Sequence, residues 1–465
     1  MPALGIIFGI SLAYVVFTTI IGMLSAKYAK DSTSFLTAKN LMGPFVVGVL
    51  VMSEFIGTGA TLGTAQTAFA KGISAAWNLV GMGVGFFLYG LFIAPKLNAL
   101  KEYTISGAVG QRYGSSTRMA VSGIMTYALI VVNVSMFTGG AATLSLLLGI
   151  SIKSCVFIVG AATILNVAFG GLRGVGISNL IHMSFKYVGL VLVSITAWKL
   201  LRATPLGLSN LPPQHFSLTG IGFPTMIAWT LANVGAVFST QYVIQCISSL
   251  NDEKEARKAG LVASMCIVPI GFFAAYIGIS ARSLFPKINS VYAMPVFLKS
   301  MDPWTAGIVT ASIVATTLVT ISACQLGATA LVMKDFFIPL FKPADKNKLL
   351  ATRVLSILIG LAPIPFALYV PGLLKTIFFA RALRTTISVI VVFMFYLPMM
   401  GSNRSAFWGL ILGSLGVVTW FFLGNPWGID NIYIGVAIPA LVMLGHGLFS
   451  RGRKAKSAVA GTPGA

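Results

Sequence analysis

Long apolar segments separated by short polar loops repeat from one end of this chain to the other. About thirteen segments approach the roughly 20 residues that a helix needs to cross a bilayer. Their approximate ranges are 3–26, 43–70, 73–95, 119–150, 152–170, 174–200, 219–247, 259–282, 304–333, 349–370, 372–400, 404–423 and 431–450. The pattern predicts an all-α polytopic membrane protein with one integral membrane domain over residues 1–465.

The second apolar stretch, residues 43–72, departs from an ordinary spanning helix. It carries Glu54 near its middle, close to Gly57, Gly59 and Gly63. Glycine costs about 1 kcal/mol relative to alanine inside a helix, and a helix broken at the membrane midplane offers backbone carbonyls to ions and solutes. The alternative is that small residues only allow tight packing between helices. The acidic residue beside the glycines favours a binding site.

The composition supports a membrane protein and changes the interpretation of the net positive charge. The chain is 57% hydrophobic and 9% charged, with a mean hydropathy of +0.91, whereas a soluble chain carries about 25% charged residues. The formal net charge is +22. Because the basic residues concentrate in loops, membrane topology and anionic lipid headgroups explain them, and no nucleic-acid partner is predicted.

Lysine and arginine are concentrated in alternate loops, which predicts the orientation. The basic loops belong on the cytoplasmic side of the cell membrane. With an odd number of spans, the N-terminus then lies outside and the C-terminus in the cytoplasm. The basic loops are those around residues 27–39, 96–118, 173, 254–258, 334–353 and 404, and the tail from 451.

The sequence contains no arrangement that favours an enzyme. His182, His215 and His446 are far apart, and no span groups a nucleophile with a base or a metal cluster. Motifs that cradle the phosphates of ATP are also absent, which argues against a primary pump. A membrane sensor is disfavoured because no cytoplasmic signalling domain follows the last span.

Five landmarks in order give the chain a resemblance to the sodium:solute symporter family. The resemblance is clear over residues 34–336. The landmarks are the broken stretch at 53–63, Gln111-Arg112-Tyr113-Gly114 within 103–118, Gly170-Gly171-Leu172-Arg173-Gly174-Val175, the stretch 241–258, and the Thr/Ser-rich segment 315–335. The resemblance implies a secondary active transporter that couples uptake of a small organic solute to sodium by alternating access.

The family's fold is the leucine-transporter type, with two inverted five-helix repeats whose first helices are broken. It implies a leading helix and loop at 1–42, repeats at 43–202 and 203–403, and trailing helices with a basic tail at 404–465. The seventh segment has its own weak point at Asn233-Val234-Gly235. Paired interruptions in corresponding positions indicate the binding site.

The resemblance also implies a sodium site without any other cofactor. Its backbone ligands are the carbonyls of Ser53 and Ile56. The ninth segment should add one carbonyl and two adjacent hydroxyls. One alignment puts these three ligands at Thr316, Val319 and Thr320, and another puts them at Thr317, Thr320 and Ile321, so one hydroxyl is missing either way. The alternative is that these hydroxyls bond within or between helices, as is common in membranes.

The sixth segment departs from the family's pattern. Where the family usually has a Thr-Asp pair and then Gln, this chain has Ser178-Asn179 and then His182, with Lys186 one turn further on the same face. Lys186 could replace the sodium ion, in a transporter coupled to protons or uncoupled. Alternatively, Lys186 pairs with Glu54, whose other candidate partner is Arg384.

The solute should lie between the two broken helices. Two candidate wall residues in the eleventh segment are arginines, and the planar fork of a guanidinium suits a carboxylate. We therefore expect an organic acid or an amino-acid-like solute rather than a neutral sugar. The candidate substrate-binding residues are Glu54, Phe55, Gly57, Thr58, Trp229, Asn233, Arg381 and Arg384.

Overall fold

The computed structural model describes residues 2–24, 31–37, 43–205, 207–368 and 373–460. Every regular element in these ranges is helical, so the predicted all-α class is confirmed. The long helices are α1 (Pro2–Leu24), α3 (Pro44–Ser53), α4 (Thr58–Lys71), α5 (Trp77–Leu88), α8 (Ser115–Leu148), α9 (Ile152–Arg202), α10 (Phe223–Ser239), α12 (Glu253–Leu284), α13 (Pro303–Val332), α15 (Asp345–Leu361), α17 (Leu373–Tyr396), α18 (Asn403–Phe422) and α19 (Asn431–Ala460). The short helices are α2 (Ser32–Leu36), α6 (Ala94–Ala99), α7 (Ile105–Tyr113), α11 (Gln241–Ile247), α14 (Ile338–Phe341) and α16 (Ile364–Ala367).

Fewer helices qualify as membrane spans than the hydropathy pattern predicts. In the described ranges, ten helices are long and apolar enough to cross a membrane, or eleven if the bent pair α10 and α11 counts as one span. The predicted count of about thirteen is therefore not confirmed. Two apolar helices, Pro44–Ser53 and Ile152–Leu165, are too short to qualify alone. Hydropathy cannot detect such interruptions, because apolar residues continue across them.

A kink joins the two segments predicted at 152–170 and 174–200. Both belong to α9, whose two helical halves meet at Gly171, where the backbone has a φ of 57°. Only glycine adopts this conformation readily. A Cβ atom at Gly171 would also lie 2.7 Å from the Phe35 carbonyl oxygen. The glycine therefore bends α9 where it passes close to α2.

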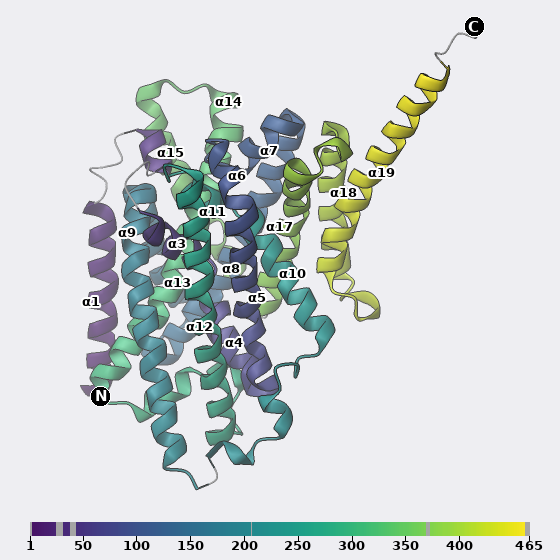
Figure 1. Cartoon of the computed structure of the whole chain (residues 1–465). Helices are drawn as coiled ribbons and strands as arrows, with labels where there is room; N and C mark the ends of the chain where they lie inside the picture. The colour runs from purple at the N-terminus through teal and green to yellow at the C-terminus, as the bar shows by residue number, and fades with distance from the viewer. Residues whose placement is uncertain (1, 25–30, 38–42, 206, 369–372, 461–465) are drawn as a thin grey trace.

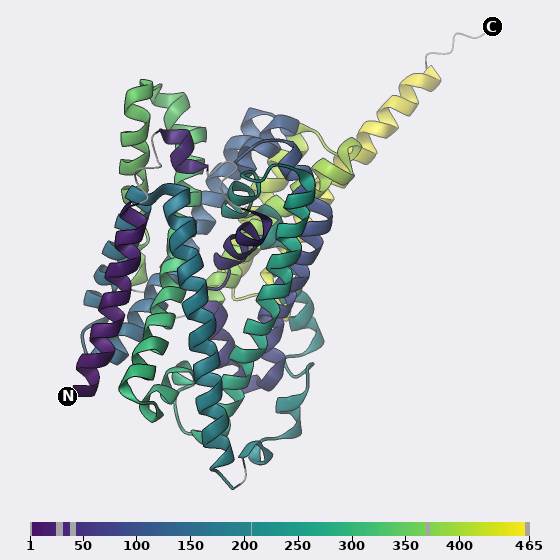
Figure 2. The same ribbon diagram turned by 60° about the vertical axis from the view of Figure 1, so that its left-hand side comes forward.

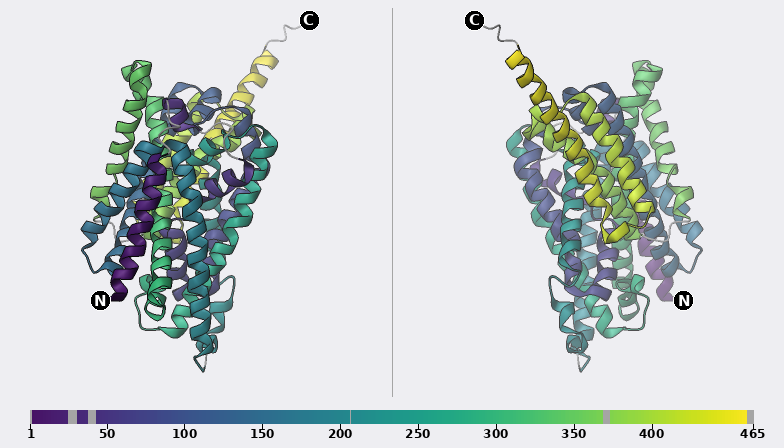
Figure 3. Two further views of the ribbon diagram at one scale, coloured as in Figure 1. Left: turned by 90° about the vertical axis from the view of Figure 1, so that its left-hand side faces the viewer. Right: turned by 90° about the vertical axis from the view of Figure 1, so that its right-hand side faces the viewer.

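The helix α13 forms the centre of the bundle. In the most apolar stretch of its span, 94% of the residues are buried, whereas the corresponding share in α1 is 17%. It packs against α9, α8 and α1, and Figure 2 shows α1 beside α9 and α13. The helix α1 lies on one side of the bundle, and α18 and α19 lie on the opposite side (Figure 3).

The ends of the bundle agree with the alternation of basic loops. Figure 1 shows α1 beginning at one end, whereas α7, α14 and the last turns of α19 lie at the other end. An odd number of crossings requires the start of α1 and the end of α19 to be on opposite sides.

The second broken span lies at a different position from the predicted one. The helix α10 continues through Asn233 and Gly235 and ends at Ser239, and α11 then leaves at an angle of 50°. Between them, Thr240 has an extended backbone conformation. The predicted weak point at Asn233-Val234-Gly235 was therefore wrong, since it precedes the break at Thr240 by about one to two helical turns. The missed signal is the run of polar residues Ser239-Thr240-Gln241 within an apolar segment.

A polar network ties α7 and α8 to the end of α13. Asp335 lies on a π-helical turn and is fully buried in its side chain. Its carboxylate accepts hydrogen bonds from Arg118 Nε at 2.6 Å and from Ser106 Oγ. Next to it, Lys334 pairs with Glu102. These two ion pairs fasten the end of the bundle at which α19 ends.

Replacing Asp335 with asparagine should measurably destabilise this end of the bundle. The change removes the charge that holds Arg118 and puts an amide NH2 where one of the two carboxylate oxygens accepts a hydrogen bond, so we expect a loss of about 1–3 kcal/mol in the free energy of unfolding. Thermal unfolding of the purified protein measures it. The matched control is Asp345→Asn, because Asp345 is 94% exposed in its pair with Lys348 and exposed pairs contribute little. Equal unfolding temperatures for the two variants would contradict a structural role for Asp335.

Candidate functional site

The first broken span is confirmed between Ser53 and Thr58. The helix α3 ends at Ser53 and α4 begins at Thr58. A Cβ atom on Gly57 would lie 2.3 Å from Met136 Sδ and 2.8 Å from Thr320 Oγ1. A larger residue at this position would therefore have to displace the side chains of Met136 and Thr320, which glycine leaves in contact with the break. The helix ends that meet here leave backbone groups without helical partners, which is what an ion or solute site requires.

A buried ion pair connects the two broken spans. Arg384 Nη1 on α17 donates to Glu54 Oε1 at 3.1 Å and to Thr240 Oγ1 at 3.0 Å. The Arg384 and Glu54 side chains are only 3% and 1% exposed. Ser239 Oγ also donates to the Arg384 carbonyl oxygen at 2.8 Å. One guanidinium thus joins the first break, at Glu54, to the second break, at Thr240.

This ion pair leaves hydrogen-bonding capacity at its edge. Glu54 Oε2 and the Nε and Nη2 atoms of Arg384 make no hydrogen bond with the described residues. Cys324 Sγ is 3.7 Å from Glu54 Oε1. Buried polar groups normally have partners. A polar group of a solute at this position would supply them.

The second arginine, Arg381, has no carboxylate partner among the described residues. Its Nη1 donates to Asn78 Oδ1 at 2.9 Å, and its guanidinium lies 4.8 Å from the ring centre of Phe378. The Arg381 residue is 4% exposed. Its neighbours are therefore an amide and an aromatic face, which orient the charge without neutralising it.

Asn78 is a site residue that the sequence analysis missed. Its carbonyl oxygen accepts from Asn233 Nδ2 at 2.7 Å, and its own Nδ2 donates to Thr64 Oγ1 at 3.0 Å. Together with its bond to Arg381, these contacts connect α5 with α4, α10 and α17. The available signal was that Asn78 is the only amide side chain in the apolar run 73–95.

A small closed cavity lies between these groups. Its volume is about 20 Å³, which is close to the space that one water molecule needs. The cavity must therefore widen before it can hold an organic solute. The residues that line it are Glu54, Phe55, Gly57, Ala60, Val132, Met136, Thr320, Ile377, Arg381 and Arg384.

The structure brings together most, but not all, of the predicted wall residues. Thr58 does not line the cavity but lies behind it, with its Oγ1 3.5 Å from Met136 Sδ. Trp229 and Asn233 also lie outside the lining. Trp229 stacks on Phe378 with ring centres 5.2 Å apart. The place of Trp229 and Asn233 in the wall of the substrate site therefore stays a prediction. Each contacts a neighbour of Arg381, since Trp229 stacks on Phe378 and Asn233 donates to Asn78.

The three threonines of the predicted sodium site on α13 differ in what their hydroxyls contact. Thr316 Oγ1 donates to the Ser312 carbonyl oxygen at 2.9 Å, and Thr317 Oγ1 donates to that of Ile313 at 3.4 Å. These two hydroxyls bond within their own helix. Thr320 Oγ1 makes no hydrogen bond with the described residues and lines the cavity. Of the three, Thr320 is therefore the one whose hydroxyl lines the cavity without a partner among the described residues.

The carbonyl of Ile56 faces Lys186. Lys186 Nζ on α9 donates to the Ile56 carbonyl oxygen, and Lys186 is 1% exposed. The proposed pairing of Lys186 with Glu54 is wrong, since Glu54 pairs with Arg384 and no ion pair of Lys186 occurs among the described residues. His182 points elsewhere, with its Nδ1 hydrogen-bonded to Tyr14 OH on α1.

The carbonyl of Ser53 lies at the other end of this break. The Ser53 carbonyl oxygen accepts from the Ile56 backbone N at 3.3 Å. The Ser53 hydroxyl donates to the Leu50 carbonyl oxygen at 2.6 Å and accepts from Asn179 Nδ2 at 3.2 Å. The two predicted backbone ligands therefore flank one short turn, and α9 supplies a polar side chain to each end of it.

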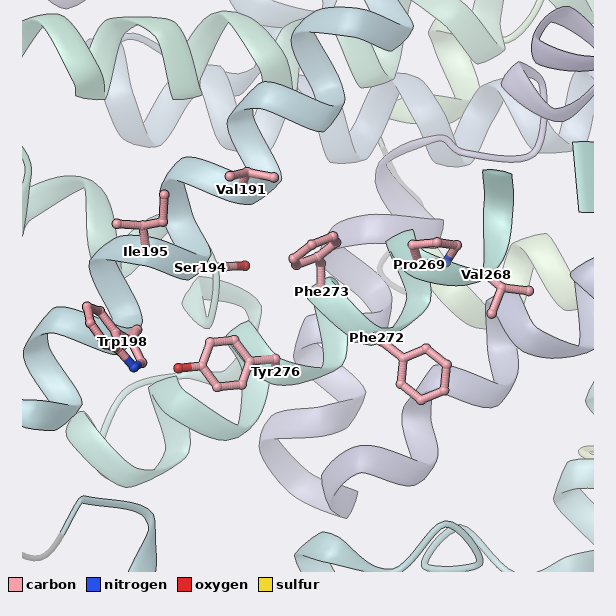
Figure 4. A pocket seen from close by; sticks show the side chains of 9 residues that line it. All are labelled: Val191, Ser194, Ile195, Trp198, Val268, Pro269, Phe272, Phe273 and Tyr276. Carbon is pink, nitrogen blue, oxygen red and sulfur yellow. The ribbon is translucent and has the colours of Figure 1, made fainter. Parts of the chain in front are cut away.

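A much larger groove lies on the outer face between α9 and α12. Its volume is about 660 Å³, and Figure 4 shows apolar and aromatic side chains from both helices around it. Its lining residues are Val191, Ser194, Ile195, Trp198, Val268, Pro269, Phe272, Phe273 and Tyr276. None of these residues is charged. The groove therefore lacks the fixed charges that the small cavity provides for an ionic solute.

Comparison with known proteins by sequence gives one family. The sodium:solute symporter family matches residues 35–413. The chain is 23% identical over 436 residues to the uncharacterized symporter YwcA of Bacillus subtilis, which covers 88% of this chain and 84% of that protein. It is 23% identical over 434 residues to the sodium/proline symporter of Escherichia coli, which covers 88% of this chain and 86% of that protein.

Comparison with solved structures supports the same fold. The substrate-bound outward-open state of a Na+-coupled sialic acid symporter superposes with a TM-score of 0.79 at 18% identity, over 96% of this chain and 97% of that one. The nucleobase-cation-symport transporter Mhp1 in a closed conformation superposes with a TM-score of 0.59 at 14% identity, over 92% and 94% of the two chains.

Proposed function

The chain belongs to the sodium:solute symporter family, and on that premise we propose that it carries a small organic carboxylate across the membrane together with sodium. Transport proceeds by alternating access around the cavity between the two broken spans. The observation that carries the substrate class is Arg381, a buried cation that lines the cavity without a carboxylate partner among the described residues.

The charges at the cavity favour an anion. Arg381 and Arg384 supply two guanidinium groups, whereas Glu54 supplies one carboxylate and already pairs with Arg384. An unpaired charge inside a protein is costly. The carboxylate of a solute would neutralise Arg381, and a guanidinium binds a carboxylate through two parallel hydrogen bonds. A neutral sugar would leave this charge unpaired.

A second candidate substrate class is an amino-acid-like zwitterion. Glu54 Oε2 makes no hydrogen bond with the described residues, so it can accept one from a protonated amine. Several relatives carry the name sodium/proline symporter. In this alternative, Arg381 binds the carboxylate of the solute and Glu54 Oε2 binds its amine.

Sodium is proposed to bind at the first break. Its ligands are the carbonyl oxygens of Ser53 and Ile56 and the hydroxyl of Thr320. Hard oxygen ligands of this kind suit a small monovalent cation, and unwound carbonyls supply them in this type of transporter. The backbone carbonyl of Thr316 or Thr317 is the further ligand proposed from α13, because neither of these two side chains lines the cavity.

The orientation follows from the basic loops. We propose that the end of the bundle containing α7, α14 and the last turns of α19 faces the cytoplasm and that α1 begins outside. The division into repeats at 43–202 and 203–403 is part of the same proposal, and the breaks beside Glu54 and at Thr240 support it. Labelling of single introduced cysteines from either side of the membrane tests the orientation.

Two experiments test the proposed function. The first screens small carboxylates, amino acids and sugars for stabilisation of the purified protein, with and without sodium, because a ligand stabilises the state that it binds. The second measures uptake of the stabilising compound into proteoliposomes under a sodium gradient, a proton gradient or no gradient. Accumulation under the sodium gradient is expected. Selective stabilisation by neutral sugars would overturn the proposal of a carboxylate substrate. Accumulation that does not depend on the sodium gradient would overturn the proposed sodium coupling.

Replacing Thr320 with alanine should weaken sodium dependence. The change removes one oxygen ligand, so the sodium concentration for half-maximal uptake should rise roughly five- to ten-fold, equivalent to about 1 kcal/mol. Uptake measured over a series of sodium concentrations gives this value. The matched control is Thr316→Val, which removes a hydroxyl bonded inside α13 and should leave sodium dependence unchanged. Identical sodium curves for Thr320→Ala and the wild type would remove Thr320 from the site.

A further inference from the structure

We infer that Lys186 is a tethered cation that holds the ion position at the first break, so that sodium must displace it in order to bind. The inference rests on the proposed function, because the Ile56 carbonyl is one of the proposed sodium ligands. Lys186 Nζ donates to this same carbonyl oxygen. An ammonium is a compact point charge, and here it occupies the ligand that the sodium ion needs.

The helix α9 is built to reach this break at both ends. Asn179 and Lys186 are seven residues apart and therefore lie on the same face of the helix, two turns from each other. Asn179 Nδ2 lies 3.2 Å from Ser53 Oγ, whereas Lys186 reaches Ile56. The helix α9 therefore contacts both ends of the break, through Asn179 at Ser53 and through Lys186 at Ile56.

The charge of Lys186 has no counterion among the described residues. The nearest carboxylate on the first broken span, Glu54, is paired with Arg384. His182, one turn earlier on α9, is hydrogen-bonded to Tyr14 and adds no negative charge. The Lys186 ammonium is thus hydrogen-bonded to a backbone carbonyl. A backbone carbonyl is also the type of group that coordinates sodium at a broken helix.

Sodium and the Lys186 ammonium therefore exclude one another at this carbonyl. Two positive charges within a few ångströms repel strongly where water is excluded. The flexible four-carbon stem of lysine allows the ammonium to leave the carbonyl while α9 stays in place. Sodium binding thus includes the displacement of Lys186, and the wild-type affinity is lower than the carbonyls and the Thr320 hydroxyl would give by themselves.

Equilibrium binding of radioactive sodium to the purified full-length protein tests this inference. The variant Lys186→Met keeps the length and loses the charge, and it should bind sodium at least about ten-fold more tightly than the wild type. The variant Lys186→Arg keeps a positive charge and should bind sodium no more tightly than the wild type. Equal or weaker sodium binding by Lys186→Met would overturn the inference.

Further variants locate the effect and guard against misfolding. Adding Thr320→Ala to Lys186→Met should remove most of the gain, because the ion loses its side-chain ligand. If Lys186→Met does not fold, as judged by thermal unfolding, Lys186→Gln provides a second neutral side chain with the same expected gain. If no folded variant and no wild-type protein binds sodium, the sodium coupling in the proposed function fails. If the wild type and the neutral variants bind sodium equally, only the role of Lys186 fails.

Discussion

Replacing Arg384 with methionine is expected to destabilise the protein strongly and to abolish transport. The variant leaves the Glu54 carboxylate buried without its countercharge. Breaking a buried ion pair by removing one partner costs about 3–5 kcal/mol, and side-chain exposures of 3% and 1% place this pair in the buried class. The same change removes the hydrogen bond to Thr240. Thermal unfolding of the purified protein and uptake into proteoliposomes measure the two effects.

The double variant Glu54→Gln with Arg384→Met separates the charge effect from the packing effect. It removes both charges, so most of the lost stability should return, because neutral replacements of a buried pair are often tolerated. Transport should stay absent, since the link between the two breaks is not restored. If the single and double variants unfold at the same temperature, the loss comes from packing at Arg384 and the ion pair contributes no stability.

The position of Arg384 explains why both effects are expected from one residue. Its side chain touches the first break through Glu54 and the second through Thr240, and its own carbonyl accepts from Ser239. In alternating access, one group of helices rocks against the other around the binding site. A displacement of one break relative to the other must therefore carry this arginine along or separate it from one partner.

The first break was predictable because its signals are local. Gly57 and Glu54 lie within four residues of each other, and their meaning depends only on helix propensity and on the cost of a buried charge. The second break was misplaced because glycine was given more weight than a run of polar residues. In the structure, Gly235 lies within α10, and the chain turns instead at Thr240.

The partners of the buried charges were beyond the reach of sequence. Glu54 and Arg384 are 330 positions apart, so their pairing depends on how the helices pack. From the sequence, Glu54 had two candidate partners, Lys186 and Arg384. The structure decides between them, because Glu54 pairs with Arg384 and Lys186 lies at Ile56. Hydroxyl directions are equally hidden, since a threonine in a helix can bond to its own backbone or point away from it. Thr316 and Thr320 lie four residues apart and differ in this respect.

Replacing Arg381 with glutamine is expected to lower the affinity for carboxylate substrates by roughly 100-fold. Hydrogen bonds to charged groups contribute about 1.5–3 kcal/mol, and the guanidinium supplies both a charge and a two-pronged donor. Glutamine can still donate to Asn78 Oδ1, as Arg381 does, so the packing around α5 should survive. Ligand-induced stabilisation over a concentration series gives the affinities of the wild type and the variant.

The decisive quantity is the preference for a carboxylate over its neutral amide analogue. The wild type should prefer the carboxylate, Arg381→Gln should lose this preference, and Arg381→Lys should keep part of it, because lysine retains the charge but not the planar fork. A general loss of folding would lower both affinities together and leave their ratio unchanged. An unchanged ratio in folded Arg381→Gln would overturn the carboxylate assignment. Selection among solutes would then depend on Glu54 Oε2, which can bind an amine but repels an anion.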